Sequence, residues 1–187
     1  MKKTLITLFF CGLTLIAKSQ NTGVKKSTFE IQTGFLGVWI HNESKLSNQL
    51  SLRSEIGLYA TIWGGSFYDK TGFALAPEIT LEPRWYYNLN KKTKKPKQID
   101  RNNGNFLSIK TTYRSNWFTI SNIKNIRVVD NISITPTWGI RRNLGNHFTY
   151  ETGLGIGYRY YLPNKNDFFA NKGEIDVNLH LRIGYKF

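Results

Sequence analysis

Apolar and polar residues alternate along most of this chain, most regularly at its C-terminal end. Every second residue from Glu174 to Phe187 is apolar: Ile175, Val177, Leu179, Leu181, Ile183, Tyr185 and Phe187. Side chains of a β-strand point to opposite faces of the sheet with this period of two. The segment is therefore predicted to be a strand with one apolar and one polar face.

The same alternation predicts strands along the rest of the chain. They are expected at residues 50–62, 73–89, 106–119, 131–141 and 147–162, with turn residues between them. Strands at this spacing are typical of a closed or nearly closed antiparallel sheet. We therefore predict an all-β fold, a single antiparallel up-and-down barrel.

The number of strands depends on the segment before residue 46. The alternation slips between Phe29 and Ile40, near Gly34 and Gly37. A glycine-permitted bulge would leave one long strand there and seven in all, whereas a tight hairpin would divide the segment into two strands. An even count is the rule for single-chain bacterial barrels in membranes, so we predict eight strands.

Three prolines, Pro77, Pro83 and Pro136, fall within predicted strands. Proline has no N–H to donate to a neighbouring strand, and a closed sheet has no free edge to tolerate it. We therefore expect bulges or strand ends at these positions.

Residues 1–19 have the features of a cleaved export signal. A short basic start precedes an apolar run from Thr4 to Ala17, and cleavage is expected after Ser19. The run has about fourteen residues, fewer than the roughly twenty that a spanning helix needs. Residues 20–187 would then form the mature barrel domain.

Composition excludes several functions. The only cysteine, Cys11, lies in the predicted signal, which excludes disulfides and thiol catalysis in the mature chain. The chain has 26 Lys and Arg against 12 Asp and Glu, a formal net charge of +14. Export would remove nucleic acid as a partner, so the charge favours lipopolysaccharide phosphates or anionic headgroups. The basic segment from Lys91 to Lys97 fits either a solvated turn or contact with such headgroups.

Aromatic residues help to separate a membrane barrel from a soluble one, since the strands of both alternate. Tyr150 and Tyr158 bracket aliphatic residues on one face. At about 3.3 Å per residue they lie roughly 26 Å apart along the strand. With a strand tilt of about 40° this becomes about 20 Å of height, near the roughly 25 Å apolar band of membrane barrels. Phe73 and Trp85 bracket their strand similarly, and we predict that this face contacts lipid.

The closing segment from Leu181 to Phe187 and strand–turn units such as Glu82 to Asn90 carry a resemblance that covers the whole mature region. The chain resembles the small outer-membrane β-barrel proteins of Gram-negative bacteria, such as the A-type and X-type outer-membrane proteins. The resemblance implies an outer-membrane location, a monomer, contact with outer-membrane lipids and lipopolysaccharide, and assembly by the barrel-assembly machinery. That machinery would read Tyr185 and Phe187. Members of the family include membrane-stabilising barrels, adhesins, narrow pores and lipid-modifying enzymes.

Such barrels end in the periplasm, which sets the direction of every predicted strand. The external loops would be residues 64–72, 121–125 and 163–173, and the periplasmic turns would be residues 47–49, 90–105 and 143–146. These external loops are short for an adhesin. Their length favours a mainly structural barrel.

The polar face of each strand would line the interior, which side chains fill in an eight-stranded barrel. The inward residues are predicted to be Arg53, Glu55, Glu78, Glu82, Arg84, Lys110, Arg114, Glu151, Arg159, Asp176, His180 and Arg182. Because buried charges need partners, we predict Arg–Glu pairs that close the lumen, with Glu82 and Glu151 contacting arginines. A gated proton or ion path through the same residues is the alternative.

Signals for an enzyme are poor. The chain has three histidines, His41, His147 and His180, and no two of them share a metal-ligand spacing. His147 and Glu151 would both point inward, but four residues along a strand separate them by roughly 13 Å, too far for an acid–base pair. We expect no catalytic residue, cofactor or metal, and a structural or surface-interaction role. A narrow pore or transport component is the first alternative and a lipid-modifying enzyme the second.

Overall fold

The computed structural model describes residues 23–64, 71–89, 102–123, 126, 128–162 and 172–187. The predicted export signal, the basic segment from Lys91 to Lys97, and residues 65–70 and 163–171 of the predicted loops lie outside this part of the chain. No helix among the described residues is long and apolar enough to cross a membrane.

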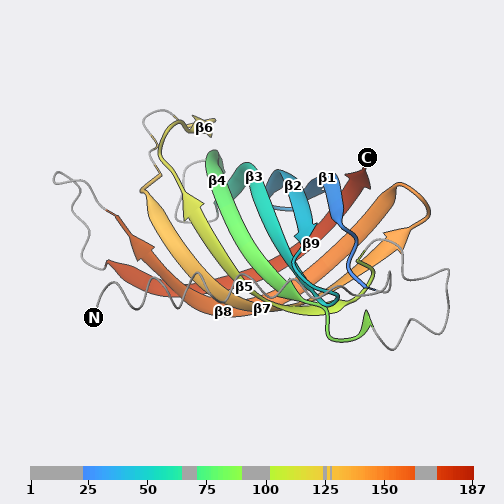
Figure 1. Cartoon of the computed structure of the whole chain (residues 1–187). Helices are drawn as coiled ribbons and strands as arrows, with labels where there is room; N and C mark the ends of the chain where they lie inside the picture. The colour runs from blue at the N-terminus through green and yellow to red at the C-terminus, as the bar shows by residue number, and fades with distance from the viewer. Residues whose placement is uncertain (1–22, 65–70, 90–101, 124–125, 127, 163–171) are drawn as a thin grey trace, which may run out of the picture.

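Antiparallel strands curl into a closed barrel (Figure 1). Its eight long strands are β1 (Ser27–Gly34), β2 (Gly37–Lys45), β3 (Leu50–Trp63), β4 (Gly72–Trp85), β5 (Asn105–Arg114), β7 (Asn131–Leu144), β8 (Phe148–Tyr161) and β9 (Gly173–Lys186). The two-residue β6 (Ile120–Ser121) pairs with the start of β4. Each long strand pairs with the next, and β1 pairs with β9 to close the sheet. The predicted all-β, up-and-down barrel is confirmed.

The two ends of the barrel differ. At the terminal end β1 begins and β9 stops, and the chain connects β2 to β3, β4 to β5 and β7 to β8. At the opposite end, the loop end, the chain connects β3 to β4, β5 to β7 and β8 to β9. The terminal end lies to the right in Figure 1, near the marked C-terminus.

A tight hairpin connects β1 and β2, as predicted from the slip in alternation. Gly34 pairs with Gly37, and the two strands stay in register back to Ser27 and Ser44. Gly37 has a φ of 143°, and a Cβ atom there would lie 2.0 Å from the backbone oxygen of Leu58. Only glycine fits both the backbone conformation and the space, and the barrel has eight strands rather than seven.

The prolines lie where pairing with one neighbour stops. Pairing between β4 and β5 is interrupted at Pro83, and pairing between β7 and β8 is interrupted at Pro136. Pro77 lies just beyond the last pair of the β4–β5 ladder, Glu78 with Arg114. The expected bulges or strand ends were wrong: all three prolines lie within β4 or β7, and the register is unchanged across the interruptions at Pro83 and Pro136, so the sheet tolerates them by omitting pairs on one side.

Two predicted strand ends were wrong. The strand expected at residues 106–119 stops at Arg114, and the one expected to reach residue 89 stops at Trp85. Trp117 and Phe118 are consecutive and both exposed. Neighbouring residues of a barrel wall point to opposite faces, so such a pair breaks the alternation on which the prediction rested.

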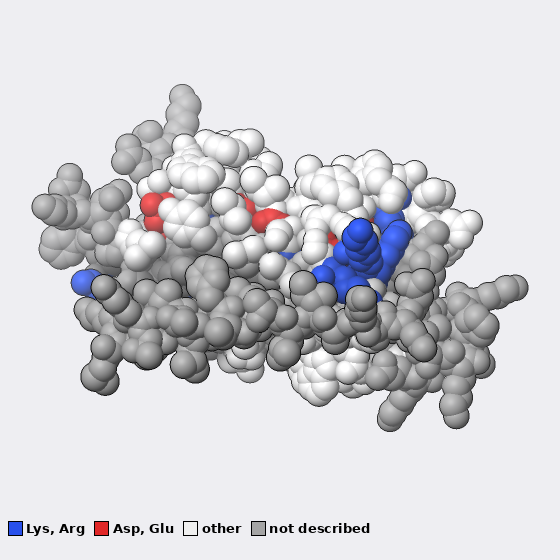
Figure 2. All heavy atoms as spheres, in the orientation of Figure 1, with Lys and Arg blue, Asp and Glu red and all other residues white. Residues whose placement is uncertain are grey.

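The barrel is apolar outside and polar inside. Isoleucine, leucine and valine side chains of the outward positions are exposed, and the largest fully buried side chains include Arg53, Arg84 and Arg141. In Figure 2, uncharged residues make up most of the described surface in view, apart from a cluster of Lys and Arg at the right and smaller groups of Asp and Glu. The candidate site therefore lies in the interior.

Candidate functional site in the barrel interior

Glu151 of β8 lies at the centre of the interior charges. Both of its oxygens accept hydrogen bonds at 2.8 Å from Arg84 of β4, the two-pronged geometry of a strong ion pair. Three more side chains approach the Glu151 carboxylate. The distance from a carboxylate oxygen to the side-chain nitrogen is 3.2 Å for Arg53 of β3, 3.3 Å for His180 of β9 and 3.6 Å for Arg141 of β7. One buried carboxylate thus joins five of the eight strands.

A second group of ion pairs lies toward the terminal end. Arg141 donates hydrogen bonds to Glu30 and, at 3.0 Å, to Glu43. Ser51 donates to Glu43 at 2.6 Å, and Thr149 donates to Glu30 at 3.0 Å. All five side chains are buried, so the two carboxylates have both a cationic and a hydroxyl partner.

Glu55 and Glu82 extend the central network to either side. Glu55 accepts hydrogen bonds from Arg53 and, at 2.7 Å, from Arg182. Glu82 accepts from Arg84 and Ser108, at 2.8 and 2.6 Å. Glu82 and Glu151 therefore contact arginines, as the sequence predicted.

The half of the lumen near the loop end holds separate pairs. Arg114 donates to Glu78 at 2.9 Å, and the Trp39 indole N–H donates to the same carboxylate at 2.6 Å. The Arg114 guanidinium also lies over the ring of Tyr59, 3.7 Å from its centre, a favourable cation–π contact. Arg159 contacts Asp176 and Glu174 at the loop end itself.

Apolar side chains close the terminal end of the lumen. Val24, Tyr86, Leu89 and Phe106 form one buried cluster, and the Arg84 guanidinium lies 4.2 Å from the centre of the Phe106 ring. Burial raises the pKa of the Tyr86 hydroxyl well above its ordinary value, so the hydroxyl stays neutral. The contact between Arg84 and Phe106 joins this cluster to the ion pairs around Glu151.

A cavity of about 380 Å³ occupies the lumen toward the loop end. Phe35, Leu36, Trp39 and Tyr59 supply much of its apolar lining. Lys110 also lines it, and no hydrogen bond or ion pair joins Lys110 to any residue that the structure describes. The interior is thus packed toward the terminal end and hollow near the loop end.

The histidines have different surroundings. His180 lies between Glu151 and the side chain of Asn178, whose Nδ2 is 3.3 Å from the imidazole Nδ1. His147 was predicted to point inward, which was wrong: it is exposed and stacks on Tyr185 at 5.6 Å. His147 precedes the first residue of β8, where the strand alternation does not apply.

The structure brings the predicted inward residues together but adds four others. Glu30, His41, Glu43 and Arg141 are all fully buried in the same network. Arg141 could have been found, because it follows the apolar Ile140 in the strand predicted at residues 131–141 and therefore falls on its polar face. The other three lie around the alternation slip, where the inward face could be assigned only once the hairpin was known.

Ion pairs with arginines neutralise the central carboxylates. Within the described ranges, no group of three or more His, Cys, Asp or Glu residues is placed to hold a metal ion. The carboxylates at the centre are already engaged by arginines, which leaves them little capacity to act as bases.

Comparison with known proteins gives no relative to guide the interpretation: no protein-family model, no curated protein and no solved structure matches the chain. The function must therefore be inferred from the barrel itself.

Proposed function

We propose that this chain is a barrel that spans the outer membrane of a Gram-negative bacterium, with a closed lumen and a structural or surface-interaction role rather than catalysis. The observation that carries the proposal is the inverted polarity of the wall, with aliphatic side chains outside and arginines inside. In water this would expose a continuous apolar surface. In lipid it is what a closed strand structure requires.

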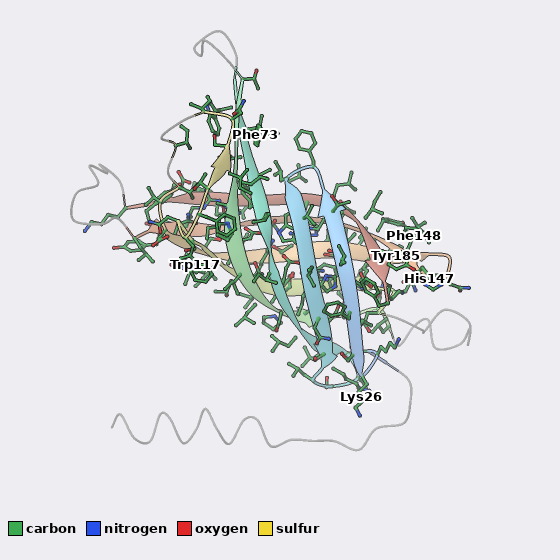
Figure 3. All side chains as sticks on the ribbon, turned by 90° about the horizontal axis from the view of Figure 1, so that it is seen from above. Lys26, Phe73, Trp117, His147, Phe148 and Tyr185 are labelled. Atoms are coloured by element: carbon green, nitrogen blue, oxygen red, sulfur yellow. The ribbon has the colours of Figure 1, made fainter. Side chains whose placement is uncertain are left out.

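Aromatic residues at both ends of the wall support this location. Figure 3 places Phe73 and Trp117 toward one end, and Phe148 and Tyr185 toward the other. Among the described residues, the exposed aromatic residues are Phe73, Trp117, Phe118, Tyr158 and Tyr160 toward the loop end, Phe29, Trp85, Trp138, Phe148, Tyr185 and Phe187 toward the terminal end, and Phe35 at the tip of the β1–β2 hairpin. Paired aromatic belts of this kind mark the two interfaces of a membrane barrel.

We further propose that the terminal end faces the periplasm. Phe187 and Tyr185 stand exposed on the outward face of β9 beside the seam with β1, accessible to assembly machinery. The loop end would then face outward, and the chain's net charge of +14 favours anionic lipid and lipopolysaccharide phosphates as its surroundings.

The packed interior supports a barrel that does not conduct. The layer around Glu151 crosses the lumen from β3, β4, β7 and β9, and the cluster containing Tyr86 and Phe106 lies between it and the terminal end. An ion would have to separate several buried pairs to pass, which costs several kcal/mol per uncompensated charge.

The test is reconstitution of residues 20–187 into lipid vesicles and planar bilayers. We expect the chain to insert as a protease-resistant barrel that migrates differently on gels before and after heating, and we expect silent current recordings. Failure to insert would contradict the membrane location.

Regular current steps from the inserted wild-type barrel would favour the narrow pore instead. In that case the variants Glu82→Gln and Glu151→Gln decide whether the current follows the ion pairs. A change in conductance or ion selectivity would assign the path to them.

A further inference from the structure

The barrel wall has a gap on the side of the β1–β2 hairpin. β1 and β2 have 8 and 9 residues, whereas β3 and β9 on either side of them have 14. β9 pairs with β1 only from Arg182 to Lys186, so residues 173–181 have no described strand beside them on that edge. In Figure 3 the blue hairpin ends while β3 continues beyond it.

The cavity near the loop end opens through this gap. Its lining includes the inward residues Asp176, Asn178 and His180 of β9. It also includes the alternate, outward residues Val177, Leu179 and Leu181. Both sets of residues meet along the edge of β9 that has no described partner strand. The cavity therefore reaches from the lumen to the gap beside this edge.

No carboxylate that the structure describes lies within ion-pair distance of Lys110 in this cavity, although Glu55, Glu78 and Glu82 act on it from further away. Each other charged side chain in its lining has an oppositely charged partner: Glu78 has Arg114, Asp176 has Arg159, and Arg182 has Glu55. Lys110 is half-buried, and no described carboxylate forms an ion pair with it. A cation in a partly desolvated site is stabilised by an anion in direct contact, so the cavity can accept one negative charge beside Lys110.

We propose that this cavity binds the carboxylate of a single-chain fatty acid, with the Lys110 ammonium as its counter-ion and the alkyl chain passing between Phe35 and Leu179 into the surrounding lipid. The inference rests on the membrane location proposed above. One unpaired cation suits a monoanion. A volume of about 380 Å³ lies toward the small end of the roughly 300–1,000 Å³ range of small-molecule sites, which suits one chain rather than a two-chain lipid. Thr112, Ser133 and Asn178 add hydrogen-bonding groups to the same lining.

The probe is a palmitate analogue with a diazirine on its alkyl chain, added to the barrel in nanodiscs of zwitterionic phosphatidylcholine. After illumination, peptide mass spectrometry locates the cross-links. We expect them on the hairpin tip and on residues 177–181, and we expect unlabelled palmitate to compete for them at least tenfold better than hexadecanol, which lacks the charge. Cross-links spread evenly around the apolar wall, without competition, would overturn the proposal.

Two variants separate the headgroup from the chain. Lys110→Met should lower the affinity for palmitate about tenfold or more and remove its advantage over hexadecanol. Lys172→Met, which removes an exposed lysine near the loop end, is the matched control and should leave competition unchanged. Equal palmitate affinity in both variants would exclude Lys110 as the counter-ion.

Ser133→Phe fills the cavity from the β7 wall and should reduce cross-linking by both ligands. Circular dichroism and the heat-dependent gel shift establish that each variant is folded. Insertion into nanodiscs is scored separately, so a barrel that inserts but shows no specific cross-link contradicts only this inference. A barrel that does not insert contradicts the membrane location itself.

Discussion

At the scale of single residues, the interior depends on how each buried charge is neutralised. Glu151 has three arginines within 3.6 Å, and those arginines in turn contact Glu30, Glu43, Glu55 and Glu82. An ion pair removed from water gains little over a well-packed apolar pair, but removal of one partner leaves the other charge uncompensated. The ion pairs therefore add little to the stability of the barrel, but replacement of any one of these charged residues is costly.

The variant Glu151→Gln tests this cost. It removes the negative charge that Arg53, Arg84 and Arg141 share, while the side chain keeps nearly the same shape. We expect the free energy of unfolding to fall by about 3–5 kcal/mol, the cost of breaking a buried pair. Urea titration of the barrel in detergent micelles, followed by tryptophan fluorescence, measures the change.

Glu174→Gln is the matched control. Glu174 also pairs with an arginine, Arg159 at 2.9 Å, but its side chain is 49% exposed at the rim. Exposed ion pairs contribute less than about 1 kcal/mol. Equal stability losses in the two variants would contradict the distinction between interior and rim.

Local alternation could assign most of these residues to the interior but could not pair them. Whether Glu151 points inward depends on its immediate neighbours, which the sequence displays. Which arginine it meets depends on the stagger of strands far apart in the chain, and Arg53 and Glu151 are separated by 98 residues. Register across distant strands is a property of the closed sheet, so the predicted Arg–Glu pairs could be stated as a class but not residue by residue.

At the scale of strands and turns, the β1–β2 hairpin decides both the strand count and the gap in the wall. The sequence allowed a bulge or a hairpin near Gly34 and Gly37, because both use glycine and both shift the alternation. The structure shows a hairpin and not a bulge, because β1 pairs with β9 on one side and β2 pairs with β3 on the other. Those contacts join residues that are remote in sequence, which is why the pattern alone left the choice open.

The substitution Gly37→Asn tests the hairpin. Gly37 has a φ of 143°, outside the left-handed region, centred at about 57°, that asparagine tolerates, and a Cβ there would lie 2.0 Å from the Leu58 backbone oxygen. We expect a loss of about 2 kcal/mol or more, since the backbone must move to relieve the overlap. Unfolding by urea measures the loss.

Gly145→Asn is the control, because the same residue is introduced where neither the backbone conformation nor the space opposes it. Gly145 has a φ of 66°, and a Cβ atom there would have nothing within 4 Å. We expect a change of about 0.5 kcal/mol or less, because the turn accepts asparagine and the site is open. If Gly37→Asn were equally mild, the hairpin would be more adaptable than its geometry indicates.

At the scale of the whole molecule, closure of the barrel depends on the seam between its first and last strands. β1 and β9 pair over five residues on each strand, from Glu30 with Lys186 to Gly34 with Arg182. Phe187 extends this seam. Its backbone N–H donates a hydrogen bond to the Phe29 carbonyl oxygen, with 3.2 Å between nitrogen and oxygen. The centre of its ring lies 5.8 Å from the ring centre of Phe29 and 5.4 Å from that of Tyr185. The C-terminus thus marks both the end of the chain and the site of closure.

The variant Phe187→Ala separates assembly in cells from stability of the finished barrel. The Phe187 side chain is 69% exposed, so its loss removes little buried area, and the purified chain should still refold in detergent. In cells we expect a much smaller fraction of heat-shifted barrel in the outer membrane, because the proposed assembly signal ends on this ring. Phe35→Ala is the control, since Phe35 is 83% exposed at the hairpin tip, remote from the C-terminus. Normal assembly of Phe187→Ala, or an equal defect in Phe35→Ala, would show that general apolar surface and not the terminal residue directs insertion.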